Sequence, residues 1–448
     1  RSIRSLFKTY IRATTEALAP SKPFLRSVFT DNAGVVVFHP GQALCVKAET
    51  HNSPSALDPY GGAITGIVGV NRDVLGTGMG AKPIFNTDVL CFAPPSTPDA
   101  EVPEGLIAPR DVLEGVHRGI VDGGNQSGIP TVAGAFLFDE SWLGKPLVFC
   151  GTGGVMPEFL DGEPSWEKSI RPGDLAVMLG GRVGKDGIHG ATFSSQALDE
   201  SSPVGAVQIG DPIIQKRMTD FLLEARDAGL YRFVTDNGAG GLSSSLGEMA
   251  RESGGVRVDL DACPLKYPGL SPWEILVSES QERMSLAVPP ESLDAFMDLA
   301  RRRGVEATAV GEFLDSGSVE IRANGGRTVG LLPLEFLHDG LPRMKLRAAL
   351  PAATRGEDPV PERSDWTPVL FDILAEPNVA SKEAWIRQYD HEVQARSVEK
   401  PMVGVRRDAP GDGAVIRADL GNFRGYTVTH GVCPRYGEDD AYRMAACA

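Results

Sequence analysis

A run of polar side chains follows directly after a short apolar stretch near the start of the chain. Residues 43–46 are apolar, and residues 47–52 read KAETHN. This pattern is typical of a strand that ends and presents side chains at the edge of a sheet, where loops on a rigid scaffold usually carry chemistry. The alternative is a polar surface turn. In the segment that follows, Pro54, Pro59 and the pair Gly61-Gly62 are predicted to break any regular strand or helix.

Three carboxylates could together bind a metal ion. Glu49, Asp73 and Asp236 are each predicted at a strand or loop end beside a glycine-rich turn. Mg²⁺ takes hard oxygen ligands in octahedral geometry and usually shares its shell with substrate phosphates. A single aspartate of this kind more simply caps a turn, so the prediction of a magnesium site depends on the set.

Two further side chains beside these carboxylates could take part in the chemistry. His51 lies between Thr50 and Asn52 and could act as a general acid or base near neutral pH, with a structural histidine as the alternative. Arg72 precedes Asp73 and could hold a phosphate while its neighbour holds the metal. An ordinary surface ion pair is the alternative there.

Glycine-rich segments indicate places where backbone could approach a phosphate. Residues 61–69, 76–80 and 237–241 are predicted to be such loops. None matches the P-loop pattern GxxxxGK[ST] or a GxGxxG after a strand of a βαβ unit, so nucleotide binding of the Walker or Rossmann type is not expected. The triplet Glu279-Ser280-Gln281 follows a strand-like segment, residues 275–277, and could be a polar recognition element or a turn.

The composition fits a globular protein with several domains. The chain has 448 residues, of which 42% are hydrophobic and 23% charged, and its formal net charge is −15. This acidic balance argues against a general nucleic-acid or membrane surface, because both need basic patches. The six cysteines show no CxxC spacing, so we expect a reduced, cytoplasmic protein without a disulfide framework or a zinc site. No stretch reaches the roughly 18 apolar residues of a membrane span.

Alternating strand and helix patterns predict two α/β units. An N-terminal segment, residues 1–27, carries an amphipathic helix over residues 2–18 and precedes the first unit, residues 28–156. In that unit a helix over 110–122 should end at Gly123-Gly124. The second unit covers residues 170–325, with helices over 211–230 and 291–303 and a helix cap among Ser243 to Ser245. Predicted strands cover residues 33–38, 43–46, 87–93, 129–132, 146–155, 175–179, 233–236, 256–260, 283–288, 306–313 and 319–322.

The end of the chain echoes its beginning. Residues 339–400 are predicted to be a linker, with a short helix over 381–394 that Ser381 caps. Gly413 then precedes Thr429-His430 by the same distance at which Gly34 precedes Thr50-His51. This predicts an internal duplication whose second copy starts within residues 401–448. We also expect the chain to be cut at both ends.

Taken together, these motifs resemble those of phosphoribosylformylglycinamidine synthase, a ligase of purine biosynthesis in the superfamily of aminoimidazole ribonucleotide synthetase. The resemblance implies an α/β (α+β) fold with a duplicated aminoimidazole ribonucleotide synthetase-like core. This chain would hold the first pair of N-terminal and C-terminal domains and the start of the second copy. The most specific motifs are KAETHNSPSALDPYGGAITG (residues 47–66), NRD (71–73), GIPTVAGAFLFDES (128–141), VQIGDP (207–212), TDNGAGGLSSS (235–245) and SESQERM (278–284).

The resemblance also implies a reaction and roles for residues. ATP would phosphorylate the amide oxygen of formylglycinamide ribonucleotide, and ammonia from a separate glutaminase subunit would displace phosphate to leave an amidine. His51 would be the proton acceptor, Lys47 would contact ATP, and Mg²⁺ would bind Glu49, Asp73 and Asp236. The substrate would be held by Thr50, Asn52, Ser53, Arg72, Gln208, Glu279, Ser280 and Gln281.

One position departs from the family's pattern, and two alternatives stay open. Ser53 stands where many members carry a second histidine, and a hydroxyl keeps a hydrogen bond but not a protonatable ring. One alternative is another ATP-dependent synthetase or kinase of the superfamily, against which the duplicated tail and the triplet at 279–281 argue. The other is a half that has lost catalysis and serves as a nucleotide-binding or assembly module. The intact set of carboxylates with His51 argues against that loss.

Overall fold

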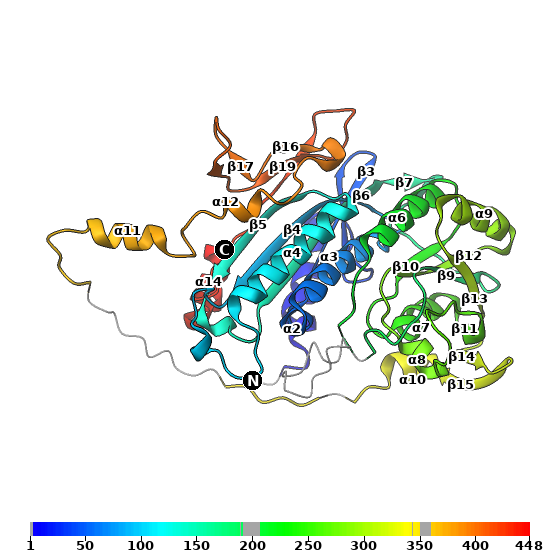
Figure 1. Cartoon of the computed structure of the whole chain (residues 1–448). Helices are drawn as coiled ribbons and strands as arrows, with labels where there is room; N and C mark the ends of the chain where they lie inside the picture. Colours follow the sequence, from blue (N-terminus) through cyan, green and yellow to red (C-terminus); the bar gives the residue numbers. More distant parts are fainter. Residues whose placement is uncertain (1–2, 189, 191–206, 343, 350–359) are drawn as a thin grey trace.

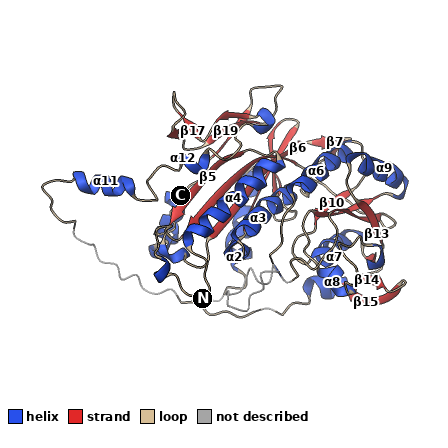
Figure 2. Cartoon of the chain, viewed as in Figure 1, coloured by secondary structure: helices blue, strands red, loops and turns tan. Residues whose placement is uncertain are grey.

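Two β-sheets, each covered by helices, form the body of the molecule. The computed structural model describes residues 3–188, 190, 207–342, 344–349 and 360–448. The first sheet has six strands in the order β1-β2-β3-β6-β4-β5, and the second has seven in the order β10-β12-β9-β13-β11-β14-β15. Figures 1 and 2 show the two sheets side by side, with helices packed on them. The predicted mixed α/β architecture is confirmed.

The first sheet is antiparallel except for one pair. Strands β4 and β5 run parallel and are joined by the helix α4 (Pro109–Ser127), which crosses over the sheet. The long strand β3 pairs with β6 along its whole length, so its polar end at Lys47 to Thr50 is held in register by residues 149–152. The strands of this sheet are β1 (Leu25–Ser27), β2 (Gly34–His39), β3 (Gln42–Thr50), β4 (Lys82–Phe92), β5 (Thr131–Phe138) and β6 (Leu147–Pro157).

Helices follow β3 directly, where the sequence predicted a break. The short helix α2 (Asn52–Leu57) leads into α3 (Pro59–Leu75), which contains Gly61 and Gly62. Pro59 is tolerated because the first helical position needs no amide donor, and the carboxylate of Asp58 caps the helix by accepting the amide of Gly61 at 3.0 Å. Residues 61–69 are therefore helical and not a loop.

Close packing explains the glycines of α3 and α4, which lie side by side over one face of the first sheet (Figure 1). Gly115, Gly119 and Gly123 recur every four residues on α4 and so share one face. A Cβ at Gly119 would lie 2.6 Å from the carbonyl oxygen of Tyr60, so the helices could not approach as they do. The predicted end at Gly123-Gly124 is wrong, because α4 continues until Gly128, which has the left-handed φ of 67°.

The second sheet is sandwiched between two helical layers. Helices α6 (Pro212–Asp227) and α9 (Leu293–Arg303) share one core with it, and α7 (Gly241–Ser253), α8 (Pro272–Val277) and α10 (Leu334–Asp339) share the other. The strand-like segment 275–277 is helical in α8, which opens with a capping box between Ser271 and Glu274. The strands are β9 (Leu175–Gly180), β10 (Phe233–Asp236), β11 (Val256–Asp259), β12 (Arg283–Val288), β13 (Ala307–Phe313), β14 (Ser318–Ala323) and β15 (Arg327–Pro333).

The C-terminal segment folds back on the first sheet. Strands β16 (Ser397–Glu399), β19 (Ala414–Arg417) and β20 (Gly425–Val428) form a small sheet. Its Ala414 and Ile416 pack against Ile84 and Phe85, on the sheet face opposite α3 and α4. Part of the predicted linker also packs on the body, since Trp385 and Tyr389 join the core around α4. The helix predicted over 381–394 is only the short α12 (Glu383–Ile386), beside α11 (Thr367–Ala375).

The remaining elements are short. The predicted N-terminal helix is present as a π-helical turn (Phe7–Arg12) followed by α1 (Ala13–Leu18), but its apolar side chains are exposed, with Leu6 at 68% and Ile11 at 54%. No helix in the described ranges is long and apolar enough to cross a membrane. Short strands and helices are β7 (Phe159–Leu160), β8 (Glu163–Pro164), β17 (Met402–Val403), β18 (Ala409–Pro410), α13 (Tyr436–Asp439) and α14 (Ala441–Cys447). Short 3₁₀ turns lie at Ala19–Ser21, Asp99–Glu101, Glu140–Trp142, Leu260–Ala262, Pro290–Ser292 and Val393–Ala395.

The glycine contact between α3 and α4 makes a stability prediction. We expect Gly119→Ala to lower the free energy of unfolding by about 1–3 kcal/mol, because the new methyl group would overlap the backbone of α3. Gly69→Ala is the matched control, since it lies in α3 with open space around its Cβ position and should gain up to about 1 kcal/mol. Urea unfolding followed by circular dichroism measures both, and equal effects of the two variants would contradict the close contact.

Candidate functional site

The predicted site residues meet where the domain of the first sheet adjoins the domain of the second sheet. A pocket of about 430 Å³ is bounded by the end of β3, the helix α3, the loop after β10 and the loop before β12. Residues from both domains therefore form one site. Most of the predicted residues line the pocket, namely Lys47, Glu49, Thr50, His51, Arg72, Asp73, Gln208, Asp236, Glu279 and Gln281.

The alternation of β3 places Lys47 and Glu49 on the same face of the strand. The Nζ atom of Lys47 lies 2.9 Å from Oε1 of Glu49 and 3.4 Å from Oδ2 of Asp73. Burial lowers the pKa of Lys47, but the two carboxylates outweigh it and raise the pKa overall. The ammonium group is therefore charged and sits between two of the carboxylates predicted to bind metal.

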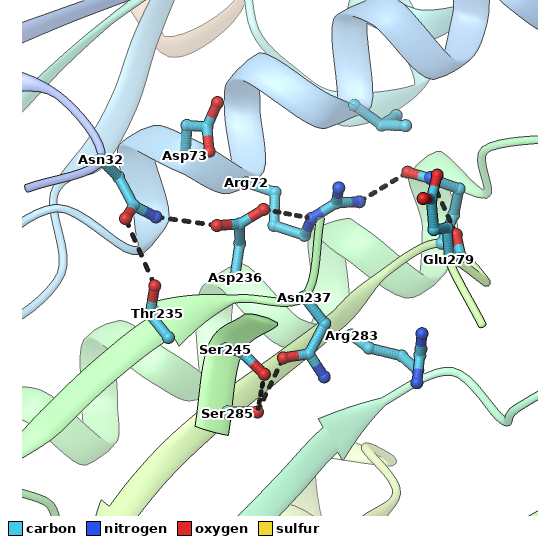
Figure 3. A network of polar contacts seen from close by, with 12 residues as sticks. Asn32, Arg72, Asp73, Thr235, Asp236, Asn237, Ser245, Glu279, Arg283 and Ser285 are labelled. Atoms are coloured by element: carbon cyan, nitrogen blue, oxygen red, sulfur yellow. Dashed lines mark hydrogen bonds and ion pairs between the residues drawn. The ribbon is translucent and has the colours of Figure 1, made fainter. Parts of the chain in front are cut away.

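Arg72 ties the two domains together from inside α3 (Figure 3). Its side chain is not a surface ion pair, because the residue is only 4% exposed. The Nε atom lies 3.4 Å from Oδ2 of Asp236, which ends β10, and Nη1 donates to Oε1 of Gln281 at 2.6 Å. A guanidinium that binds a carboxylate and an amide oxygen at fixed positions holds the loop of the second domain against α3.

The three carboxylates predicted to bind metal share this pocket. Burial, followed by the charges of Asp236 and Glu49, raises the pKa of Asp73 well above its usual value. Within the described residues, no group of three or more His, Cys, Asp or Glu side chains is arranged so that it could hold a metal ion. Lys47 and Arg72 pair with these carboxylates instead. The donor set nevertheless fits Mg²⁺, because it offers only hard oxygens whose mutual repulsion a divalent cation would relieve.

His51 is held at the end of β3 by its ring. Nδ1 donates to the carbonyl oxygen of Gly62 at 2.5 Å, so the neutral ring presents Nε2 as an acceptor. Burial lowers the pKa of His51, which favours this neutral form. Gly66 lets α3 pass close to the ring, because a Cβ there would lie 3.1 Å from Cβ of His51 and 2.9 Å from Sγ of Cys150.

A chain of hydrogen bonds fixes the polar triplet Glu279-Ser280-Gln281. The amide of Gln281 donates to Oε1 of Gln208, and Nε2 of Gln208 donates to Oε2 of Glu279 at 2.7 Å. The backbone amide of Gly240 donates to Oε1 of Glu279 at 3.1 Å. These bonds join the segment at 207–208, the loop after β10 and the triplet into one wall of the pocket.

Three predicted substrate contacts lie outside the pocket lining. Oδ1 of Asn52 accepts the backbone amide of Val148 at 2.8 Å, and Ser53 is buried at 1% exposure in α2. Oγ of Ser280 donates to Asp186 at 2.5 Å and accepts the amide of Gly184 at 2.9 Å, so it shapes the triplet from behind. Their substrate roles stay predictions. His189, in the glycine-rich segment 180–190, lies outside the described residues.

The structure adds pocket residues that sequence reasoning missed. Asn32 donates to Oδ1 of Asp236 at 3.0 Å, and its Oδ1 accepts from Thr235 at 3.3 Å (Figure 3). Gly76 permits this contact, because a Cβ there would lie 2.5 Å from Nδ2 of Asn32. A signal was present in the sequence: the triplet Thr-Asp-Asn occurs at both 30–32 and 235–237. Other missed lining residues are Asp31, Thr65 and Glu248.

Arg283 supports the triplet from within the second domain (Figure 3). It is fully buried, and it donates to the carbonyl oxygens of Ser280 at 2.8 Å and Ser278 at 2.5 Å. Burial lowers its pKa to about 10, so the guanidinium stays charged at neutral pH. Gly241, with φ of 55°, passes so close to this loop that a Cβ would lie 1.9 Å from the carbonyl oxygen of Ser278.

Comparisons with known families match both domains. The model of AIR synthase related protein, N-terminal domain, matches residues 30–156, and the model of AIR synthase related protein, C-terminal domain, matches residues 171–324. The chain is 40% identical to phosphoribosylformylglycinamidine synthase subunit PurL of Methanopyrus kandleri over 83% of this chain and 50% of that protein. It is 36% identical to the PurL subunit of Streptomyces coelicolor over 98% of this chain and 57% of that protein.

Solved structures give the same result. T. maritima PurL complexed with FGAR matches with a TM-score of 0.70 and 30% identity, over 93% of this chain and 61% of that one. T. maritima PurL complexed with ATP matches with a TM-score of 0.63 and 28% identity, over 91% and 58%. The chain spans about half the length of the curated relatives it matches. The resemblance predicted from the motifs is confirmed.

The bond from His51 to Gly62 predicts a tautomer. At a pH where the ring is neutral, we expect its proton on Nδ1, because only an N–H can satisfy the carbonyl oxygen. Nitrogen-15 chemical shifts of the labelled imidazoles report this directly, with His51→Gln used for assignment. His338 is the internal control, since its Nε2 faces the carbonyl of Gly247 at 3.1 Å and should carry the proton there. A proton on Nε2 of His51 would contradict the geometry.

Proposed function

Because the chain belongs to the family of AIR synthase related proteins, with PurL subunits as its relatives, we propose that it carries the synthetase site of a phosphoribosylformylglycinamidine synthase. The reaction would be the ATP-dependent conversion of formylglycinamide ribonucleotide to the corresponding amidine with ammonia. The observation that carries this proposal is the pocket at the junction of the two domains, which gathers the residues that the family motifs supply.

The charges of the pocket suit a nucleotide that arrives with a metal. Among the described lining residues, the acidic side chains are Asp31, Glu49, Asp73, Asp236, Glu248 and Glu279, and the Lys and Arg side chains are Lys47 and Arg72. A triphosphate would be repelled by this excess of carboxylates unless divalent cations accompanied it. Glu49, Asp73 and Asp236 would hold Mg²⁺, which would neutralise charge on the phosphoryl group that is transferred. Lys47 would then move from the carboxylates to the phosphates.

The hydrogen-bonded side chains on one wall of the pocket suit recognition of the amide substrate. Arg72, Gln281 and Gln208 are held by one another, so they present donors and acceptors that need little reorganisation on binding. His51 offers Nε2 as a proton acceptor beside Thr50, where it would take a proton from the attacking nitrogen. These residues would orient the formylglycinamide group in line with the phosphate.

Partners and surroundings are part of the proposal. The relatives are named as subunits, which supports a separate glutaminase partner that supplies ammonia. The domain division at 28–156 and 170–325, with a second copy starting at 401–448, is supported by the hairpin β19–β20, which precedes Thr429-His430 as β2–β3 precedes His51. A cytoplasmic location is supported by the cysteines at positions 45, 91, 150, 263, 433 and 447, which are free thiols.

Turnover tests the reaction and the role of His51. We expect ADP release that needs both formylglycinamide ribonucleotide and ammonium, measured with Mg·ATP on the chain extended to the length of its relatives. His51→Asn should lower the rate by about 10²–10⁴-fold, as loss of a general base does, while calorimetry shows substrate affinity largely kept. The control His39→Asn, at the end of β2, should leave both unchanged. Release without the ribonucleotide would contradict the reaction, and an unchanged rate in His51→Asn would support a non-catalytic half.

Metal binding is tested without turnover. Mg²⁺ at about ten times its dissociation constant should stabilise the folded chain by about 1.4 kcal/mol, which for a chain of this size corresponds to a rise in melting temperature of about 1–2 °C. Asp236→Asn should lose most of this rise, because it removes one of the oxygen ligands. Asp227→Asn, at the exposed end of α6, is the matched control and should keep it. An equal rise in both variants would place the metal elsewhere.

A further inference from the structure

A second cavity lies between the first sheet and the C-terminal segment. It has a volume of about 190 Å³ and lies between β4–β5 and residues 382–430. It is distinct from the pocket at the domain junction, because the two share no lining residue. Its walls are mainly apolar and aromatic, with Leu90, Val132, Phe136, Ile386, Tyr389 and Pro401 among them.

Asp88 on β4 places in this cavity a carboxyl group that forms no ion pair with any described side chain. The residue is only 4% exposed, and within the described part of the chain no side chain donates a hydrogen bond to its carboxylate, which lies beside the backbone amide of Gly151. None of the ion pairs found in the described residues involves Asp88. Burial raises its pKa to about 8. An acid buried without a cationic partner is costly, so its presence here calls for a ligand that pairs with it. The hydroxyl of Thr131, also in the lining and 5% exposed, lacks a partner as well.

Two basic side chains that line the cavity, His391 and Lys382, already bond to backbone carbonyls. Nδ1 of His391 faces the carbonyl of Thr131 at 2.9 Å, and its Nε2 faces that of Ile386 at 2.9 Å. Nζ of Lys382 donates to the carbonyl of Ala380 at 2.6 Å. His391 and Lys382 therefore do not pair with Asp88. The cavity combines this acidic side chain with mainly apolar and aromatic walls.

We propose that this Asp88 cavity is a binding site for a small planar organic cation of the amidine type, whose paired N–H groups bind both oxygens of Asp88. A planar amidinium matches a carboxylate with two parallel hydrogen bonds, and its opposite charge favours the ionised acid. The ring attached to it packs between the aromatic walls at Phe136 and Tyr389. The volume suits one ring with its amidine, since an apolar cavity of about 150 Å³ is enough to bind benzene.

Benzamidine is the probe for this site, with neutral benzamide as its isosteric control. We expect calorimetry on the full chain to give a dissociation constant of about 1 mM or tighter for benzamidine and much weaker binding of benzamide. Trp385, whose ring centroid lies 4.8 Å from that of Phe136, offers a fluorescence signal for the same titration.

Two variants decide whether the carboxyl and the cavity carry the binding. Asp88→Asn keeps the shape and removes the charge, so it should weaken benzamidine at least about tenfold. It should not lower the melting temperature, because it removes a buried acid that has no cationic partner. Ile386→Trp fills the cavity from α12 and should abolish binding without touching Asp88. Asp111→Asn, exposed on α4, is the control and should bind as the unaltered chain does.

The same titrations can overturn the site. No binding of benzamidine up to about 10 mM, or equal affinity for benzamide, would contradict an amidine site. Unchanged binding in Asp88→Asn or in Ile386→Trp would place the probe elsewhere on the protein. Because Ile386→Trp changes a partly exposed residue, it remains decisive if Asp88→Asn fails to fold. None of these binding measurements depends on purine-synthase turnover, so they test this cavity separately from the proposed function.

Discussion

The contact between Arg72 and Asp236 is the constraint on which the rest of the site depends. It joins a helix of the first domain to the end of a strand in the second, over a sequence separation of 164 residues. A buried guanidinium needs its partners, because leaving it unpaired costs far more than a surface charge would. The position of Arg72 therefore fixes how α3 meets β10, and with it the distance between the carboxylates and the polar chain from Gln281 to Glu279.

The helix that carries Arg72 is where sequence reasoning failed most. Residues 59–62 contain a proline and two glycines, which normally interrupt regular structure, yet they form the first turn of α3. The tertiary contacts explain this. Gly62 and Gly66 let the helix pass against α2 and His51, while Gly119 lets α4 pass against it. The glycines predicted to cradle phosphate at 61–69 instead bring helix backbone close to other elements. The local helix propensity of these residues does not reflect such close contacts, because several of the contacting elements are distant in sequence.

Side-chain chemistry was more predictable than backbone form. The polar run after residues 43–46, the pair Arg72-Asp73 and the carboxylate at the end of β10 were all read from local sequence, and the structure brings them to one pocket. Residues recognised only by their long-range partner were missed. Asn32 bonds to Asp236 across 204 residues, and its signal in the sequence is the distant repeat of the triplet Thr-Asp-Asn at 30–32 and 235–237. The substrate role of Ser280 came from the family resemblance and stays a prediction, while the structure shows its side chain buried and bonded to Asp186 behind the triplet.

The ion pairs of the pocket suggest how the site prepares for a highly charged ligand. Lys47 bridges Glu49 and Asp73, and Arg72 binds Asp236, so each carboxylate proposed to bind metal already contacts a cation. These cations keep the acids close together against their repulsion, which adds to the effect of burial in raising the pKa of Asp73. A divalent ion brought by a nucleotide could take over that neutralising role and release Lys47 toward the phosphates. The pocket would then exchange one set of ion pairs for another while the backbone around it stays in place. A preorganised site of this kind needs little reorganisation when its ligand binds.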